Sequence, residues 1–307
     1  MAKKYTKSAG VSRLPRRESE LPRGVSVGHW TDAKGRTGCT VILAPDGGAV
    51  GGVDVRGAAP GTLGTDALQP STLIERAHAV LLTGGSVFGL EAAGGIMRYL
   101  EERHVGFAFG SVRVPTVVGA VIFDLLVGDP RARPNGNAGY AACAAATRAP
   151  EIGAIGAGTG ASVAKGGSGR EVRPGGVGIA SARADRAIVT AVIVANSVGG
   201  IWDDERHDWV APLTQWNRAS NLLPGANTTI GVLVTDAKLT KEQANRVATV
   251  AHDGIARAVR PAHTMYDGDT IFCLATGSLN APYDAVEAVA ADVVARAIVV
   301  GVRAAQR

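Results

Sequence analysis

The stretch Ala187–Ala195 reads AIVTAVIVA and is apolar at every position except Thr190. A near-continuous apolar run of this length is typical of a β-strand that is covered on both faces. Farther along the chain, Thr228–Thr235 (TTIGVLVT) and Ile271–Ala275 (IFCLA) have the same β-rich character. We therefore expect these three segments to be strands in the interior of the protein.

Alanine-rich segments separate the predicted strands and have the apolar spacing of helices. Lys241–Val259 carries one apolar stripe, and Ala281–Ala305 reads as a long alanine and valine helix. The N-terminal half alternates in the same way. Its predicted elements are the strands Cys39–Ala44, Ala49–Val55, Ala79–Leu82 and Ala120–Leu126 and the helices Val87–Arg103 and Gly139–Arg148.

One tight connection helps to select the fold class. The turn Pro45–Gly48 (PDGG) joins Cys39–Ala44 to Ala49–Val55 and predicts that these strands pair antiparallel. Interleaved strands and helices with such a connection favour sheets packed on each other, with helices outside, over a doubly wound sheet. The sequence thus predicts an α/β (α+β) fold, and residues 24–307 are expected to form a single domain.

The charge, the apolar runs and the cysteines limit the functional classes and cellular locations that the sequence favours. Residues 1–23 supply much of the formal charge of +5 but have no apolar signal core, and no basic folded face with aromatic partners is visible. We therefore expect a disordered, solvated basic tail that binds no nucleic acid. No apolar run reaches the roughly 18–20 residues that span a bilayer. The chain is expected to be cytoplasmic and to make no membrane contact. The scattered Cys39, Cys143 and Cys273 are expected to be free and buried.

Two glycine motifs and the histidines do not meet the requirements of better-known sites. Gly156–Gly160 (GAGTG) brings its third glycine one position too early for a dinucleotide loop. Gly84–Gly89 (GGSVFG) has Phe88 where a nucleophile elbow needs glycine. The six histidines include no HxxxH or HExxH pair, so the sequence gives little support to a metal site.

The informative stretch is Gly225–Val232 (GANTTIGV), where two threonines follow an asparagine at the mouth of a predicted strand. Alone it is a common pattern, because threonine is frequent in strands. Other short segments accompany it in a fixed order along most of the chain. They are VGHWTD (27–32), TGCTV (37–41), LTGGSVFGLEA (82–92), GAGTGA (156–161) leading to Lys165, VAN (194–196), NTTI (227–230) and DGDT (267–270).

Read together over residues 24–300, these segments resemble one family: the L-aminopeptidase/D-amino-acid esterases, β-peptidyl aminopeptidases and nylon-oligomer (6-aminohexanoate-oligomer) endohydrolases. The resemblance implies a four-layer αββα sandwich, and it implies that the chain cleaves its own peptide bond between Asn227 and Thr228. It implies a large chain, 24–227, and a small chain, 228–307, that stay associated without a cofactor or metal. It also implies a homotetramer or larger assembly. The Asn-Thr pair at the cut favours the nylon-oligomer branch.

The resemblance assigns roles to a small set of residues. Thr228 would be the nucleophile, and its freed α-amine would be the base. Lys165 would help to keep that amine neutral by like-charge repulsion, and the Asn196 amide would donate to an oxyanion. Asp267 and Asp269 stand at alternate positions, so both carboxylates are expected to face Thr228. One of them would orient its hydroxyl and amine, while the other would hold the positive end of the substrate.

Two aromatic residues and the choice of reaction remain open. Phe123 aligns where some members carry a substrate-site tyrosine, so the ring is kept and the hydroxyl is lost. Tyr140 is a candidate to replace that hydroxyl, and a helical core tyrosine is its other interpretation. The expected activity is hydrolysis of linear amides through an acyl-Thr228, on 6-aminohexanoate oligomers or short peptides and amino-acid amides. An acyltransferase of the ornithine-acetyltransferase type and a non-catalytic binding protein are the alternatives.

Overall fold

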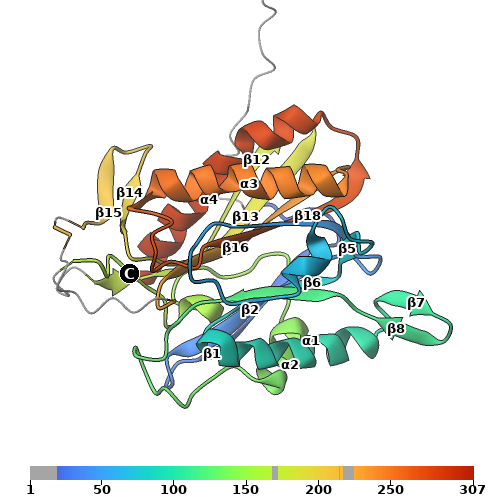
Figure 1. Ribbon diagram of the computed structural model, residues 1–307, viewed down its shortest axis with the longest axis horizontal. Helices are drawn as coiled ribbons and strands as arrows, with labels where there is room; N and C mark the ends of the chain where they lie inside the picture. The colour runs from blue at the N-terminus through green and yellow to red at the C-terminus, as the bar shows by residue number, and fades with distance from the viewer. Residues whose placement is uncertain (1–18, 168–171, 214, 217–224) are drawn as a thin grey trace, which may run out of the picture.

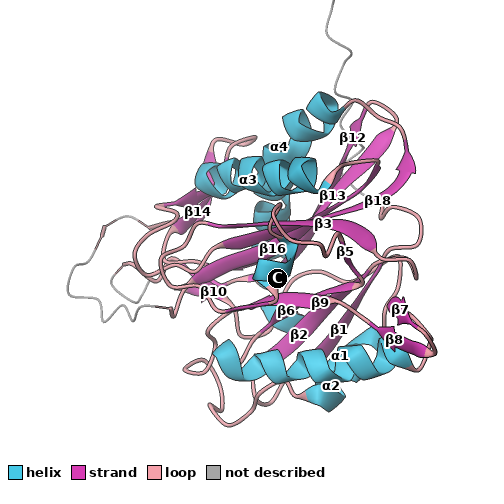
Figure 2. Cartoon of the chain, turned by 45° about the vertical axis from the view of Figure 1, so that its right-hand side comes forward, coloured by secondary structure: helices cyan, strands magenta, loops and turns pink. Residues whose placement is uncertain are grey.

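The computed structural model describes residues 19–167, 172–213, 215–216 and 225–307, and all statements below concern these residues. Two β-sheets lie face to face, with a pair of helices on the outer side of each (Figure 1). The order of layers is helix, sheet, sheet, helix (Figure 2). The predicted four-layer αββα sandwich is therefore confirmed.

Sheet A forms the lower half of the molecule in Figure 1, and helices α1 and α2 cover its outer face. Its strand order is β1-β2-β6-β9-β4. The bounds are β1 Ser26–Asp32, β2 Thr37–Leu43, β4 Thr62–Leu63, β6 Ala79–Thr83, β9 Val117–Val121, α1 Ala92–Glu101 and α2 Gly136–Ala144.

Sheet B forms the upper half, and helices α3 and α4 cover it. Its strand order is β12-β13-β16-β18-β3-β5. Helix α3 begins at a capping box, in which the side chains of Thr240 and Gln243 bind each other's backbone N–H groups. The bounds are β3 Ala49–Val55, β5 Arg76–Ala77, β12 Gly176–Ala184, β13 Ala187–Asn196, β16 Thr228–Ala237, β18 Thr270–Leu279, α3 Lys241–Ala258 and α4 Tyr283–Ala305.

Shorter elements decorate the sandwich. The hairpin β7–β8 projects from one end in Figure 1, and the small sheet β15-β14-β17 lies at the other. The remaining bounds are β7 Phe107–Phe109, β8 Val112–Val114, β10 Ser162–Val163, β11 Arg173–Pro174, β14 Gly200–Asp203, β15 Asp208–Ala211, β17 Val259–Arg260, and the 3₁₀ helices η1 Thr65–Leu68, η2 Ser86–Glu91 and η3 Gly156–Gly158.

Alternating side chains on each strand build the two faces of the sheets. On β16, Ile230 and Val232 enter the core between the sheets, whereas Leu233 enters the core under α3 and α4. On β2, Ile42 points between the sheets and Val41 points toward α1 and α2. Because both faces of these strands are covered, their sequences read as continuous apolar runs.

Helix crossovers bring the site-bearing strands side by side. A parallel pair of strands needs a long connection, usually a helix. Strand β16 runs parallel to β18 through α3, and β6 runs parallel to β9 through α1. Strand β13 pairs antiparallel with the other edge of β16. The start of β16 therefore lies between the end of β13 and the segment that enters β18.

The predicted pairing of Cys39–Ala44 with Ala49–Val55 is wrong. The turn forms as expected, and the Gly48 N–H donates to the Pro45 carbonyl at 2.7 Å. Strand β2, however, pairs with β1 and β6 in sheet A, while β3 pairs with β18 and β5 in sheet B. A glycine turn fixes a reversal of the chain, but the sheet that each strand joins depends on partners far away in the sequence.

Element boundaries depart from the predictions in the N-terminal half. The predicted helix Val87–Arg103 opens as the 3₁₀ helix η2 and becomes α-helical only at Ala92. A Cβ on Gly89 would lie 1.9 Å from the Gly84 carbonyl oxygen, so the backbones of these two residues approach too closely for a side chain at position 89. The strand predicted at Ala120–Leu126 is β9, which ends at Val121.

The end of the predicted basic tail is part of the folded structure. Residues 1–18 lie outside the described part of the chain. The Leu21 side chain is buried, and Arg148 donates to the carbonyl oxygens of Leu21 and Pro22 at 2.7 and 3.0 Å. Folded contacts thus begin before Gly24, earlier than predicted. Cys39, Cys143 and Cys273 are free and buried, as expected.

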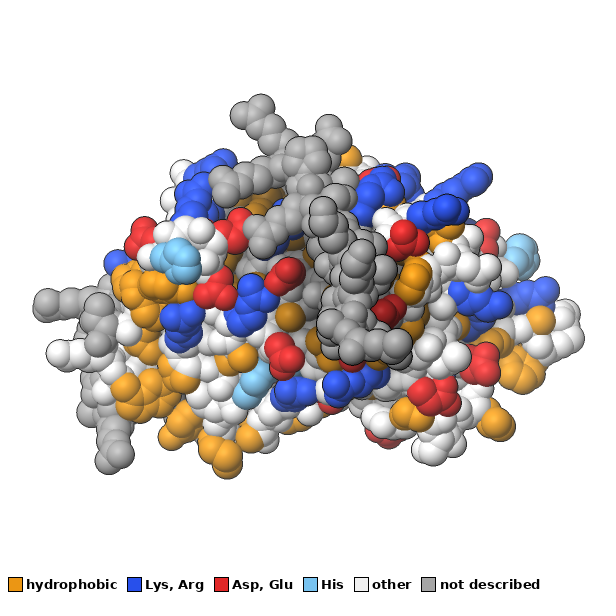
Figure 3. All heavy atoms as spheres, turned by 90° about the horizontal axis from the view of Figure 1, so that it is seen from above, with side chains coloured by type: hydrophobic (Ala, Val, Ile, Leu, Met, Phe, Trp, Pro, Cys, Tyr) orange, Lys and Arg blue, Asp and Glu red, His pale blue; other side chains and the backbone are white. Residues whose placement is uncertain are grey.

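The helices that the structure describes include none that is long and apolar enough to cross a membrane. The face above α3 and α4 mixes Lys and Arg with Asp and Glu side chains (Figure 3).

Candidate active site

Thr228 is the first residue of β16 and stands between two segments that the sequence analysis had singled out. Its register partner on β13 is Asn196, the last residue of that strand. On the other side, Asn227 forms a parallel bridge with Asp267, just before β18. Three segments distant in sequence therefore meet at one buried point.

The peptide bond between Asn227 and Thr228 is held by polar contacts. Both residues are buried, with exposed fractions of 1% and 2%. The Thr228 hydroxyl donates to the Asn227 carbonyl oxygen, and the Gly268 N–H donates to the same oxygen at 2.9 Å. The hydroxyl thus lies beside the carbonyl that precedes it, and a second donor polarises that carbonyl.

Lys165 reaches this point from a loop that follows β10. The loop is bound to the segment that follows β13, because the N–H groups of Ala164 and Gly166 donate to the Gly199 and Val198 carbonyls, each at 2.9 Å. Lys165 Nζ donates to three oxygens: Asn196 O at 3.1 Å, Asn196 Oδ1 at 2.9 Å and Ala226 O at 2.9 Å. These acceptors match the three N–H groups of an ammonium.

Burial lowers the pKa of Lys165 to about 7, although the carboxylates of Asp267 and Asp124 act in the opposite direction. Desolvation disfavours the charged amine, and nearby negative charge favours it. Both protonation states are therefore populated near neutral pH. Because Lys165 lies beside the Asn227–Thr228 bond, a change in its protonation state changes the electrostatic potential at that bond.

Asn196 is completely buried, and its two amide atoms have different roles. Oδ1 accepts from Ser162 N at 3.0 Å and from Lys165 Nζ at 2.9 Å, which fixes the orientation of the amide. Nδ2 has only long contacts, at 3.5 Å, to the carbonyl oxygens of Phe123 and Ala226. Contacts of this length are weak, so Nδ2 is available to a stronger acceptor.

The two aspartates are buried, but their described hydrogen bonds go to groups other than the Thr228 side chain. Asp267 accepts from Val198 N at 3.3 Å and from the N and Oγ1 of Thr264 at 2.9 and 2.6 Å. Asp269 accepts from Thr229 N at 2.6 Å. The strand begins only at Thr270, so the alternation of side chains within a strand does not extend to residues 267–269, and the expectation that both carboxylates face Thr228 stays a prediction.

Two neighbouring residues that the sequence analysis missed hold these aspartates. His263 Nδ1 lies 2.8 Å from Asp269 Oδ2, and Thr264 binds Asp267. A loop at residues 56–59 presses on the same segment, and a Cβ on Gly57 would lie 2.3 Å from Asp269 N. The only signal in the sequence is the closeness of His-Thr to the DGD motif.

A third buried carboxylate, Asp124, was also missed. Its oxygens accept from Thr37 Oγ1 and Gly85 N, each at 2.7 Å. Burial raises its pKa, and these hydrogen bonds and Lys165 oppose the rise. The Gly84–Gly89 motif therefore supports a buried acid beside the lysine. An isolated acid at the end of an apolar strand was the available signal.

The two aromatic candidates have different positions. Phe123 is partly buried beside Asn196, which contacts its carbonyl oxygen. Tyr140 is not brought to the site. It lies on α2, outside sheet A, where its hydroxyl donates to Glu102 at 2.7 Å and its ring packs against Tyr99. Tyr140 therefore lies on an outer helix and does not replace the hydroxyl that Phe123 lacks.

The glycine-rich segment Gly156–Gly160 has a packing role. Gly156 N and Ala157 N donate to the side chains of Thr31 and Thr40 at 2.8 and 3.1 Å, which ties η3 to sheet A. Within the described ranges, no group of three or more His, Cys, Asp or Glu is arranged to hold a metal ion.

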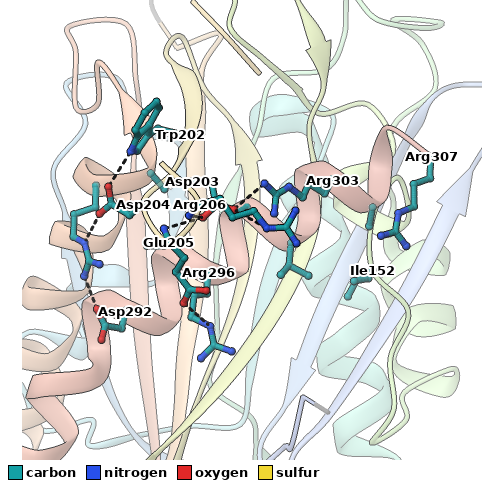
Figure 4. Close-up of a pocket in the computed structure, with 16 residues that line it drawn as sticks. Ile152, Trp202, Asp203, Asp204, Glu205, Arg206, Asp292, Arg296, Arg303 and Arg307 are labelled. Carbon is teal, nitrogen blue, oxygen red and sulfur yellow. Dashed lines mark hydrogen bonds and ion pairs between the residues drawn. The ribbon is translucent and has the colours of Figure 1, made fainter. Parts of the chain in front are cut away.

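A cavity of about 300 Å³ lies away from Thr228, between α4 and the turn after β14 (Figure 4). Its charged groups pair with one another: Asp203 with Arg303 at 2.8 Å, and Asp292 with Arg257. Its lining does not include Lys165, Asn196, Thr228, Asp267 or Asp269. The candidate active site is therefore at the start of β16 and not in this cavity.

The arrangement at Thr228 can support attack on a carbonyl. It combines a hydroxyl beside an amide carbonyl, an amine with a pKa near neutrality and a weakly bound amide donor. Acyl transfer uses groups of these kinds as nucleophile, charge-tuning group and oxyanion donor.

Comparisons with known proteins find relatives along most of the chain. The model of peptidase family S58 matches residues 23–307. An uncharacterised aminopeptidase of Mycobacterium tuberculosis is 41% identical, with 92% of each chain covered. A 6-aminohexanoate-oligomer endohydrolase of a Kocuria species is 33% identical over 84% of this chain and 75% of its own length.

A solved structure shares the fold. The L-aminopeptidase D-Ala-esterase/amidase of Ochrobactrum anthropi, described as a variant of the Ntn hydrolase fold, superposes with a TM-score of 0.71. The match has 20% sequence identity and covers 94% of this chain and 88% of that one.

Proposed function

The chain belongs to peptidase family S58 and is a hydrolase of amide bonds, and we propose that it cuts its own Asn227–Thr228 bond and then uses Thr228 as its nucleophile. The observation that carries the proposal is the contact of the Thr228 hydroxyl with the Asn227 carbonyl, which also accepts from Gly268 N. The carbonyl to be attacked is thus paired with both a nucleophile and an electrophilic donor.

The self-cleavage step follows from these contacts. Thr228 Oγ1 attacks the Asn227 carbonyl carbon, and the Gly268 N–H stabilises the negative charge on the oxygen. The C–N bond breaks as the hydroxyl proton passes to the Thr228 nitrogen, and the product is an ester with a free amine. Water then hydrolyses the ester, which leaves an Asn227 carboxylate and a free Thr228 hydroxyl.

Turnover repeats this chemistry on an external amide. The Thr228 amine, with an ordinary pKa of ~7.7–8.0, takes the hydroxyl proton as Oγ1 attacks the substrate. Asn196 Nδ2 leaves its 3.5 Å contacts and donates to the oxyanion. The Thr228 amine passes the proton to the substrate nitrogen as the C–N bond breaks and the amine product leaves. Water then hydrolyses the acyl-Thr228 ester to the free acid. Lys165, while charged, opposes protonation of the amine.

We propose that the substrates are short linear amides with a free amine, either peptides and amino-acid amides or 6-aminohexanoate oligomers. The Asn-Thr cut site and the endohydrolase relatives favour the oligomers, and the higher identity to the mycobacterial aminopeptidase favours the peptides. A homo-oligomer and a cytoplasmic location remain predictions.

A product analysis tests hydrolysis against transfer. The purified protein is incubated with an L-amino-acid p-nitroanilide, a dipeptide or 6-aminohexanoate trimer, with and without ornithine or hydroxylamine. We expect the free acid in every case, with little acylated acceptor. Quantitative transfer to ornithine in place of hydrolysis would identify an acyltransferase, and the absence of any reaction would favour a binding protein.

Asn196→Asp is expected to lower kcat by at least about 10²-fold, the usual cost of losing one oxyanion donor. The variant keeps an oxygen for Ser162 N and Lys165 Nζ and replaces the Nδ2 donor with a carboxylate oxygen, which adds a negative charge. Asn245→Asp is the matched control, because Asn245 Oδ1 also accepts a backbone N–H, from Val53 at 3.1 Å, far from Thr228. Equal kcat values for the two variants would remove Asn196 from the oxyanion site.

A further inference from the structure

A buried chain of contacts runs from Thr229 to His263. Asp269 Oδ1 accepts from Thr229 N at 2.6 Å, and Asp269 Oδ2 accepts from His263 N at 3.2 Å. His263 Nδ1 lies 2.8 Å from the same Oδ2. One carboxylate, with an exposed fraction of 1%, therefore links the imidazole to the backbone of the residue that follows Thr228.

The loop around His263 is shaped for this contact. His263 has a φ of 54°, a left-handed conformation that costs energy in residues other than glycine. Its backbone N–H and its ring both bind Asp269, which offsets that cost. Histidine, like asparagine, is among the residues that tolerate this conformation best.

We propose that His263 is a positioning residue for the reaction at Thr228, an inference that rests on the function proposed above. As a cation paired with Asp269, it keeps that carboxylate ionised and bound to the Thr229 N–H. Since Thr229 is joined directly to Thr228, the His263–Asp269 pair also holds Thr228, the first residue of β16, in place. His263 itself contacts neither the hydroxyl nor the substrate carbonyl.

The charges around His263 favour the cation. Burial lowers the pKa of His263, but the hydrogen bond and charge of Asp269 outweigh it, so that its pKa is raised. Arg56, in the loop after β3, acts against the cation. The other ring packed against His263 is His252 of α3, at a centroid distance of 5.0 Å.

His252 stays neutral and leaves the proton to His263. Its Nε2 lies 3.0 Å from the Asp54 carbonyl oxygen and 3.9 Å from the Asp54 carboxylate. Burial, together with the charge of His263, lowers the pKa of His252 to about 4. Of the two adjacent histidines, only His263, the one beside Asp269, carries a positive charge.

His263→Asn tests the role of this charge, because asparagine keeps an N–H donor near the Nδ1 position and tolerates the left-handed backbone. A buried carboxylate without its cation takes up a proton more readily, so the variant should lose activity mainly on the acid side. We expect kcat for an L-amino-acid p-nitroanilide to be about tenfold below wild type at pH 6, with KM unchanged. The two kcat values should converge as the pH rises and wild-type His263 loses its proton.

His104→Asn is the matched control, since His104 has a similar φ of 56° but is exposed and remote from Thr228. A ratio of wild-type to variant kcat that is independent of pH would overturn the proposal, because a purely structural role lowers activity equally at all pH values. A wild-type chain without turnover would instead contradict the proposed function.

A second measurement tests the proposal even if His263→Asn fails to fold. In uncleaved Thr228→Ala protein, an NMR titration of the His263 ring should show a proton retained above pH 6.5, the ordinary value for histidine. A ring that is already neutral at pH 6.5 would overturn the proposal without any need for turnover.

Discussion

Thr228→Ala is expected to leave the chain as one polypeptide and to lower turnover by on the order of 10⁶-fold, the usual cost of removing a catalytic nucleophile. The variant removes the hydroxyl that contacts the Asn227 carbonyl and leaves the backbone of β16 unchanged. Intact-mass spectrometry of the denatured protein gives the first result, and p-nitroaniline release gives the second.

Two further variants make this result specific. Thr228→Ser keeps a hydroxyl at the same place, so its chain should still be cut. Thr229→Val is the matched control: Thr229 is equally buried, and its Oγ1 has no hydrogen-bond partner among the described residues. Cleavage that persists in Thr228→Ala but stops in Thr229→Val would transfer the nucleophile to the neighbouring threonine.

Lys165→Met is expected to lower kcat by about 10²-fold, within the range for groups that assist proton transfer. Methionine fills much of the same space but donates to none of the three oxygens that Nζ binds. Loss of the like charge also raises the pKa of the Thr228 amine. The acid limb of the pH profile of kcat should therefore move to higher pH.

Lys241→Met provides the matched control for Lys165→Met. Lys241 Nζ also donates to three oxygens, at 2.7–3.2 Å, but on Ala67 and Thr72. Its replacement is expected to lower the thermal midpoint while leaving the pH profile of kcat unchanged. An unshifted acid limb in Lys165→Met would show that Lys165 does not tune the amine.

The sequence predicted the layers of the fold better than the pairing of its strands. Runs such as Ala187–Ala195 can be apolar throughout only if both faces are covered, so the sandwich was predictable from local pattern. The pairing of β2 and β3 was not, because Cys39 and Val53 find partners in different sheets through contacts distant in sequence.

The candidate site was predictable where a motif carries the residue itself. Lys165, Asn196 and Thr228 meet as the resemblance implied. His263 was missed because its role depends on a left-handed backbone and on a partner six residues away, neither of which a pattern of residue types reveals. Tyr140 kept two interpretations, a substrate-site residue and a helical core tyrosine, because an aromatic residue on a helix has no signature of the layer that it occupies.

The intact mass of the denatured wild-type protein tests the central claim most directly. The account predicts two fragments that meet at Asn227 and Thr228, with masses that add up to that of the 31.3 kDa chain plus one water. A single species at the full-length mass, under conditions where the protein is folded, would contradict it.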